Sequence, residues 1–178
     1  MISIAIVDDH RLMRAGLANM IAGFKGYKVT IEAGNGLLFI ESLKKNKAPS
    51  IVLLDINMPA MDGYQTAQWI RQNLPDTKII ALSMYDNDYA IIQMLKNGCH
   101  GYLLKNSEPM LLYTAFNEIK KYGYFSNDMV SDKLIHYIGD ESALKKQQEQ
   151  VNHLTEKEIA FMGWVCTDKT YKEIADIM

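Results

Sequence analysis

The fold of this chain follows from one stretch, Ile51-Val52-Leu53-Leu54-Asp55-Ile56-Asn57-Met58-Pro59-Ala60-Met61-Asp62-Gly63. It begins with four consecutive apolar residues, bounded by Pro49 and Pro59. A continuous apolar run is typical of a parallel strand that helices cover on both faces, so we expect a fully buried strand at 51–54. Asp55 ends the run, at the edge of the sheet where doubly wound folds bind their ligands. Asp55 is therefore the first candidate functional residue.

Apolar runs alternate with amphipathic segments on both sides of this stretch. The predicted strands lie at 2–7, 28–32, 51–54, 78–83 and 101–104. The predicted helices lie at 11–21, 37–45, 64–73 and 87–96, with a last one from a Ser107 cap to about 121. Five strands that alternate with five helices leave room for the long, right-handed crossovers that parallel strands need. Residues 1–122 are therefore predicted to form an α/β domain, a five-stranded parallel sheet doubly wound by helices.

Length and composition limit the architecture and the partners. At 178 residues, of which 48% are hydrophobic, the chain is long enough for one domain and a smaller C-terminal helical segment. The net charge of -2 shows no global signature of nucleic-acid or membrane binding, and no apolar stretch approaches the roughly 18 residues of a membrane span. The N-terminus lacks the basic region of a signal peptide, and Cys99 and Cys166 stand alone, which fits a reducing cytosol. We therefore expect a cytoplasmic protein.

Polar residues stand at the ends of several predicted strands, namely Asp8, Asp9, Asp55, Ser83 and Lys105. Because the carboxyl ends of parallel strands meet at one edge of a sheet, these side chains should converge. Two carboxylates about 5 Å apart repel by roughly 3 kcal/mol at an effective dielectric constant of about 20, so the pocket needs a cation. Oxygen ligands favour Mg²⁺, and the Lys105 ammonium adds a fixed positive charge. A phosphoryl group on Asp55 would then be held by the metal, by Lys105 and by the Ser83 hydroxyl.

Each of these residues also has an ordinary interpretation when it is taken alone. An aspartate after a strand is commonly a turn residue or a helix cap, a lysine is commonly a solvated surface charge, and a serine is commonly a loop hydroxyl. Their common location at one edge of the predicted sheet favours a functional site.

Four segments resemble the receiver domain of two-component response regulators, and they lie in that family's order and spacing over about the first 120 residues. The segments are Asp8-Asp9, Leu53 to Gly63, Ala81-Leu82-Ser83 and Gly101-Tyr102-Leu103-Leu104-Lys105. The resemblance implies a flavodoxin-like fold and phosphorylation of Asp55 by a partner histidine kinase. It further implies that Asp9 and Asp55 bind Mg²⁺ directly, together with the backbone carbonyl of Asn57, and that Asp8 acts through a bound water.

The same resemblance implies a conformational switch. Ser83 would take the family's Thr/Ser switch position, and Tyr102 would be its switch aromatic residue. Phosphorylation adds charge and strong acceptor oxygens, which Ser83 can approach, and Tyr102 can then turn inward. The output face should be the fourth helix, fifth strand and fifth helix, roughly 87–121.

The composition changes after Tyr124. A short helix is predicted from Ser126 to Ile138, and the charged, glutamine-rich residues 140–152 show almost no apolar stripe. We therefore expect a helical linker at 123–152.

Two capping boxes, which start at Thr155 and Thr170, predict two short helices within 153–178. These helices resemble the front of the LuxR-type (NarL-like) helix-turn-helix domain, although a generic helical hairpin has the same pattern. The sequence ends at Met178, ahead of the recognition helix that the family uses for base readout. We therefore expect an incomplete DNA-binding domain at 153–178, and DNA binding only by the full-length protein.

Together these features predict a response regulator in which phosphorylation of Asp55 switches a C-terminal DNA-binding output that controls transcription. One alternative is a receiver that acts only through protein contacts. Another is a magnesium-dependent hydrolase with Asp55 as its nucleophile, but Asn57 stands where aspartate-based phosphatases have their second carboxylate. We expect no enzyme activity beyond self-phosphorylation and autodephosphorylation. The expected partners are a sensor histidine kinase and, on phosphorylation, a second copy of the chain.

Overall fold

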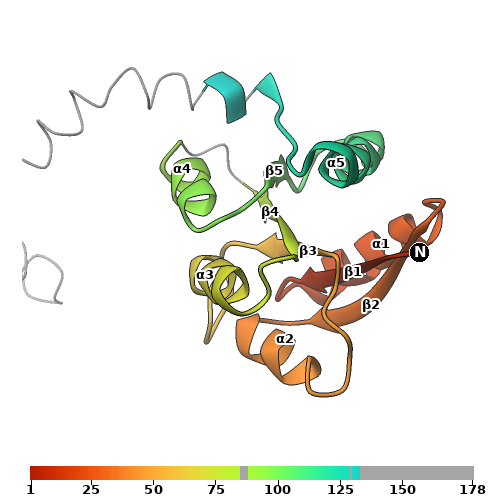
Figure 1. The fold of residues 1–178 in the computed structure, drawn as a ribbon, viewed down its shortest axis with the longest axis vertical. Coiled ribbons are helices and arrows are strands. Elements are labelled where there is room, and N and C mark those ends of the chain that lie inside the picture. Colours follow the sequence, from red (N-terminus) through yellow and green to blue (C-terminus); the bar gives the residue numbers. More distant parts are fainter. Residues whose placement is uncertain (85–87, 129, 133–178) are drawn as a thin grey trace, which may run out of the picture. The chain divides into compact units, whose positions relative to one another are not determined.

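Five parallel strands form one sheet in the order β2-β1-β3-β4-β5 (Figure 1). The strands are β1 Ile2–Val7, β2 Tyr27–Ala33, β3 Ile51–Asp55, β4 Lys78–Ser83 and β5 Gly101–Leu104. This computed structural model describes residues 1–84, 88–128 and 130–132. Of the predicted linker at 123–152, residue 129 and residues 133–152 lie outside the described residues, as does the whole predicted helix-turn-helix at 153–178. The parallel sheet and all five predicted strands are confirmed.

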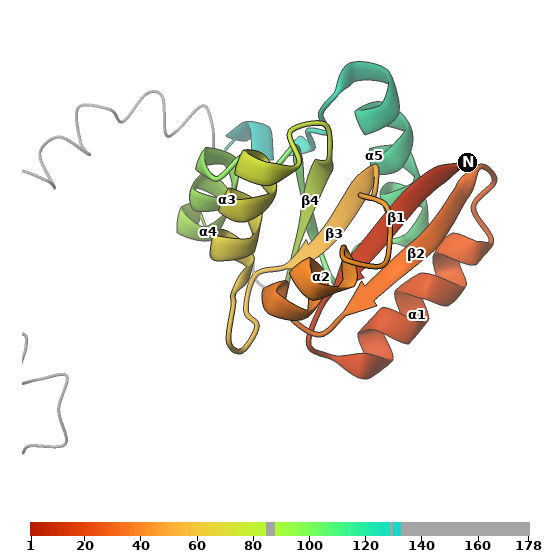
Figure 2. The same cartoon turned by 60° about the horizontal axis from the view of Figure 1, so that its bottom comes forward.

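The helices cover both faces of the sheet. They are α1 Arg11–Ala22, α2 Gly36–Ser42, α3 Gly63–Asn73, α4 Asp88–Lys96 and α5 Pro109–Tyr122. Residues of α2, α3 and α4 pack into one apolar cluster, and residues of α1 and α5 pack into another on the opposite face (Figure 2). Among the helices described, none has the length and the apolar character that crossing a bilayer requires.

Burial on both faces explains the apolar runs of the strands. All residues of β3 are buried. Val52 and Leu54 of β3 belong to the cluster under α2, α3 and α4, whereas Ile51 and Leu53 belong to the cluster under α1 and α5. Alternate side chains of a strand point to opposite faces, so a strand between two layers of helices has no polar face.

Several predicted boundaries differ from the structure. Helix α5 begins at Pro109 with Glu108 as its N-cap, so the prediction that Ser107 caps it is wrong. A proline disfavours the helical region for the residue before it, and Glu108 is accordingly extended at φ -62° and ψ 144°. Helix α2 ends at Ser42 rather than at Lys45. Helix α4 begins at Asp88, and Asn87, where we expected its start, lies outside the described residues.

The chain after α5 folds back along the edge strand β5. Gly123 ends α5 in the left-handed region at φ 88°. The Phe125 amide then donates to the His100 carbonyl at 2.8 Å, and the Asn127 side-chain amide donates to the Tyr102 carbonyl at 3.4 Å. Asn127 Oδ1 accepts from the Val130 amide at 3.0 Å, so Asn127 caps the helical residues that follow, which begin at Asp128 rather than at the predicted Ser126. This segment covers part of the edge that β5 would otherwise expose.

Candidate functional site

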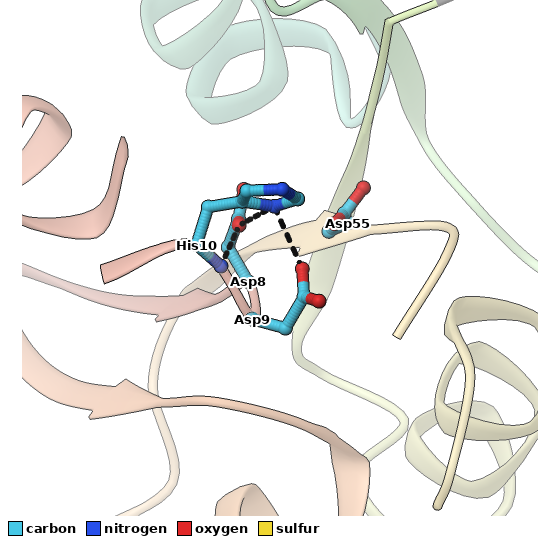
Figure 3. A group of neighbouring side chains, drawn as sticks. All are labelled: Asp8, Asp9, His10 and Asp55. Atoms are coloured by element: carbon cyan, nitrogen blue, oxygen red, sulfur yellow. Dashed lines mark hydrogen bonds and ion pairs between the residues drawn. The ribbon is translucent and has the colours of Figure 1, made fainter. Parts of the chain in front are cut away.

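The three predicted site carboxylates meet at the carboxyl ends of the neighbouring strands β1 and β3. Val7 pairs with Leu54 in the β1–β3 register, so Asp8 and Asp55, the next residue of each chain segment, lie side by side. Asp9 and His10 follow Asp8 into the loop before α1 (Figure 3). This is the point where the strand order reverses, and it is where doubly wound sheets form their binding crevice.

Lys105 connects two of these carboxylates. It follows β5, and its Nζ lies 2.8 Å from Asp8 Oδ2 and 2.9 Å from Asp55 Oδ2. Only 3% of its side chain is exposed. Burial alone would lower the pKa of Lys105, but its hydrogen bonds to Asp8 and Asp55 outweigh burial and leave the pKa raised. Lys105 is therefore a fixed cation within the pocket, as the sequence predicts.

Asp55 is held at both oxygens. Its Oδ1 accepts a hydrogen bond from the Ile56 amide at 2.8 Å, and its Oδ2 faces Lys105. The residue is only 4% exposed, and burial raises its pKa. The charge of Asp8 raises the pKa further, while the hydrogen bond and charge of Lys105 oppose both effects without cancelling them. Burial, the largest of these effects, therefore leaves Asp55 easier to protonate than an ordinary aspartate.

His10 completes the acidic cluster, and sequence reasoning missed it. Its backbone amide donates to Asp8 Oδ1 at 2.8 Å, and its ring Nδ1 lies 2.8 Å from Asp9 Oδ1 and 3.4 Å from Asp8 Oδ1. The guanidinium of Arg14 also donates to the Asp8 carbonyl. A signal for His10 was present, because an imidazole directly after two aspartates adds a third metal-binding side chain.

The cluster fits a divalent cation. Asp8, Asp9, His10 and Asp55 each offer one ligand atom, and these atoms lie within 4.8 Å of one another. Asp8 Oδ2 and Asp9 Oδ1 are shielded from solvent, and their polar neighbours in the described part of the chain are the Lys105 ammonium and the His10 ring nitrogen, each at 2.8 Å. Three carboxylates against one ammonium leave an excess of negative charge that a divalent cation would balance.

Ser83 lies beside this pocket, and Asn57 lies in the turn that follows β3. Asp55 pairs with Leu82 in the β3–β4 register, so Ser83 stands one residue beyond Asp55, and it is buried. The Ser83 carbonyl accepts from the Lys105 amide at 2.7 Å, which connects the ends of β4 and β5. Asn57 is exposed, and its role as a carbonyl ligand stays a prediction.

Tyr102 lies inward. Tyr102 is fully buried, in the apolar cluster that also contains Ile91 and Met94 of α4 and Val130. The sequence predicts that Tyr102 turns inward on phosphorylation, and the inward position is the one that this structure has. Tyr102 pairs with Ala81 in the β4–β5 register, two residues before Ser83.

The loop between β3 and α3 holds Asp55 in place. Asp62 caps α3 through a hydrogen bond from the Gln65 amide to its Oδ1 at 2.8 Å. The Gly63 amide donates to the Ile56 carbonyl at 2.8 Å, and a Cβ at Gly63 would overlap the Asp55 carbonyl and approach Ile56 Cα to 2.7 Å. A side chain at position 63 would therefore push against the backbone of the strand end that carries Asp55.

Comparisons with known proteins agree with this geometry. The family described as "Response regulator receiver domain" matches residues 4–117. The transcriptional regulatory protein DegU of Brevibacillus brevis is 32% identical over 134 residues, which are 75% of this chain and 56% of that protein, so the chain spans little more than half of its length. The uncharacterized transcriptional regulatory protein YhcZ of Bacillus subtilis (strain 168) is 31% identical over 172 residues, which are 97% of this chain and 78% of YhcZ. The crystal structure of a LuxR-family two-component response regulator from Aurantimonas sp. SI85-9A1 matches with a TM-score of 0.69 and 26% identity, and covers 78% of this chain and 99% of that one.

Proposed function

The chain belongs to the two-component response regulators through a receiver domain at residues 4–117, and we propose that it carries a phosphorylation signal on Asp55. The observation that supports Asp55 is its pairing with Lys105, whose Nζ lies 2.9 Å from Asp55 Oδ2 and 2.8 Å from Asp8 Oδ2. Asp55 is thus a carboxylate at a sheet edge with a fixed cation beside it. A sensor histidine kinase is the proposed phosphoryl donor.

The transfer can be written with the residues of the chain. A carboxylate oxygen of Asp55 forms a bond to phosphorus while the bond between phosphorus and the donor atom breaks, and the donor keeps the electron pair. The Lys105 ammonium, already within hydrogen-bond reach of Asp55, can stabilise the oxygens of the transferred group. The product is an acyl phosphate on Asp55, which water can hydrolyse. We propose no enzyme activity beyond this self-phosphorylation and autodephosphorylation.

Mg²⁺ is the proposed cofactor of the acidic pocket. Asp9 and Asp55 would hold it directly with the Asn57 carbonyl, and Asp8 would act through a water. When bound, it supplies positive charge beside the phosphoryl oxygens. Support comes from the fit of the carboxylate cluster to a divalent cation and from the excess of its three carboxylates over the one Lys105 ammonium.

Ser83 and Tyr102 are the proposed switch. Oxygens of a phosphoryl group on Asp55 would attract the Ser83 hydroxyl and draw the end of β4 toward the pocket, because charge-assisted hydrogen bonds are among the stronger ones. To take the active fraction from about 1% to about 99%, phosphorylation must favour the active state by about 5.5 kcal/mol. The Ser83 carbonyl already accepts a hydrogen bond from the backbone amide of Lys105, the residue after β5. Movement at the end of β4 is therefore linked to β5, the strand that carries Tyr102.

Transcriptional control is the proposed output. We propose a receiver at 1–122, a linker at 123–152 and part of a LuxR-type helix-turn-helix domain at 153–178. Support comes from the similarity to YhcZ, which extends over 97% of this chain. DNA binding belongs to the full-length protein in this proposal, and phosphorylation favours a homodimer. A cytoplasmic location stays a prediction from the sequence.

Phosphorylation can be tested with acetyl phosphate and Mg²⁺, followed by intact-mass measurement. We expect wild type to gain the mass of one phosphoryl group and Asp55→Ala to gain none. Asp76→Ala is the matched control, because Asp76 is an exposed aspartate in the turn before β4, and it should be labelled like wild type. A mass gain that persists in Asp55→Ala would overturn the assignment. Turnover of small phosphate esters by wild type would instead favour the hydrolase alternative.

A further inference from the structure

We propose that His10 is a metal-binding residue of the acidic pocket, and that it makes the pocket prefer first-row transition-metal dications over Mg²⁺. The proposal rests on the metal site in the proposed function and adds a nitrogen ligand to it. Three points support it: His10 lies at the start of α1, its ring is turned toward Asp8 and Asp9, and imidazole nitrogen is a good ligand for transition metals.

The position of His10 gives its side chain no role in its own helix. His10 is the N-cap of α1, with φ -80° and ψ 104°, and its side chain makes no capping hydrogen bond. Ser, Thr, Asp and Asn are the residues that cap helices well, because their short side chains reach the free backbone amides. The first hydrogen bond of α1 is a backbone one, in which the Arg14 amide donates to the His10 carbonyl at 3.1 Å, so the helix starts without a side-chain cap.

The ring of His10 is turned to the carboxylates instead. Its Nδ1 lies 2.8 Å from Asp9 Oδ1 and 3.4 Å from Asp8 Oδ1 (Figure 3). The ligand atoms of Asp8, Asp9, His10 and Asp55 all lie within 4.8 Å of one another, so one cation can reach the His10 nitrogen and the Asp9 and Asp55 oxygens together after small side-chain movements, with Asp8 within reach through a water. The His10 side chain is 70% exposed, which leaves it free to make those movements.

The added ligand changes which metals the pocket favours. Mg²⁺ binds oxygen ligands and gains little from an imidazole, whereas Mn²⁺, Co²⁺, Ni²⁺ and Zn²⁺ accept imidazole nitrogen readily. A site with carboxylates alone relies on charge, which all divalent cations share. His10 adds a nitrogen ligand that transition-metal dications bind more strongly than Mg²⁺ does. The preference over Mg²⁺ should be larger for Ni²⁺ than for Mn²⁺.

The direct test is pulsed electron paramagnetic resonance on the Mn²⁺-loaded full chain at about pH 8, since metal ligation by imidazole needs a neutral ring. We expect a nitrogen coupling from a coordinated imidazole in wild type and its loss in His10→Ala. His153→Ala, which removes a different histidine, is the matched control and should keep the nitrogen coupling. The absence of nitrogen coupling in wild type, or its persistence in His10→Ala, would overturn the proposal.

Metal affinities give a second readout. By calorimetric titration, His10→Ala should weaken Ni²⁺ binding by about tenfold or more and change Mg²⁺ binding by less than about twofold. An equal loss for both metals would mean that His10 only positions Asp9, and would overturn the proposal. The acetyl phosphate experiment separates this from the proposed function: failure to label Asp55 while the nitrogen coupling is present would reject the phosphorylation site and leave His10 as a ligand.

Discussion

Replacement of Lys105 by methionine tests the charge balance of the pocket. The change keeps an unbranched side chain that is one atom shorter, and it removes the cation that lies 2.8 Å from Asp8 Oδ2 and 2.9 Å from Asp55 Oδ2. The two carboxylates then stay buried without a counter-charge, and the loss of one partner of a buried ion pair typically costs about 3–5 kcal/mol. We therefore expect Lys105→Met to lower the free energy of unfolding substantially at neutral pH.

Protonation of Asp55 sets a ceiling on the part of this loss that Asp55 carries. Neutralising a carboxyl group costs about 1.4 kcal/mol for each pH unit above its ordinary pKa, which is 3.8 for Asp55. The ceiling is therefore about 4.5 kcal/mol at pH 7 and about 1.7 kcal/mol at pH 5. The folded pKa of Asp55 is raised by burial, so the stability that its protonated form contributes is present at low pH and is lost as pH rises through the folded pKa. Removal of Lys105 raises that pKa further, and the difference between variant and wild type should shrink on acidification.

Urea denaturation followed by circular dichroism, with a chelator present so that no metal replaces the ammonium, measures the effect. We expect a loss of about 3 kcal/mol at pH 7 and less than about 1.5 kcal/mol at pH 5. Lys120→Met is the matched control, because Lys120 is exposed on α5, and it should change stability by no more than about 0.5 kcal/mol. A loss at pH 7 below about 1 kcal/mol, or one that is the same at both pH values, would refute the charge-balance reasoning.

Three further perturbations test the surrounding structure. Ala60→Gly should stabilise the fold by up to about 1 kcal/mol in urea denaturation, because Ala60 has a φ of 68°, which favours glycine; a loss of stability would contradict this. Gly63→Ala should destabilise by at least about 2 kcal/mol in the same assay, since the added Cβ would approach Ile56 Cα to 2.7 Å, and unchanged stability would reject that clash. His100 has its pKa lowered to about 4 by burial and by the charge of Lys78, so its contribution to stability is present above pH 6.5 and is lost as pH falls toward 4. His100→Asn should flatten the dependence of unfolding free energy on pH in that range, and an unchanged slope would show that another group titrates.

The local pattern of the chain determined the elements and the candidate pocket. Strands inside a double layer of helices have to be apolar on both faces, so 51–54 could be recognised as buried without any knowledge of its neighbours. Once the strands are parallel, residues that follow them meet at one edge, which brought Asp8, Asp55 and Lys105 into one hypothesis. The Glu108 cap was missed because two residues before a helix compete for that position, and the proline after Glu108 decides between them.

Side-chain direction was decided only by the tertiary structure. Nothing local to position 105 says that its ammonium bridges two aspartates, because Asp8 and Asp55 reach it through a strand order that depends on the whole sheet. The same holds for Tyr102, which is inward under α4, and for Asn127, which returns from beyond α5 to the edge of β5. Periodicity reports which face of an element is apolar, whereas contacts between residues distant in sequence depend on how the elements pack, and packing is a property of the complete fold.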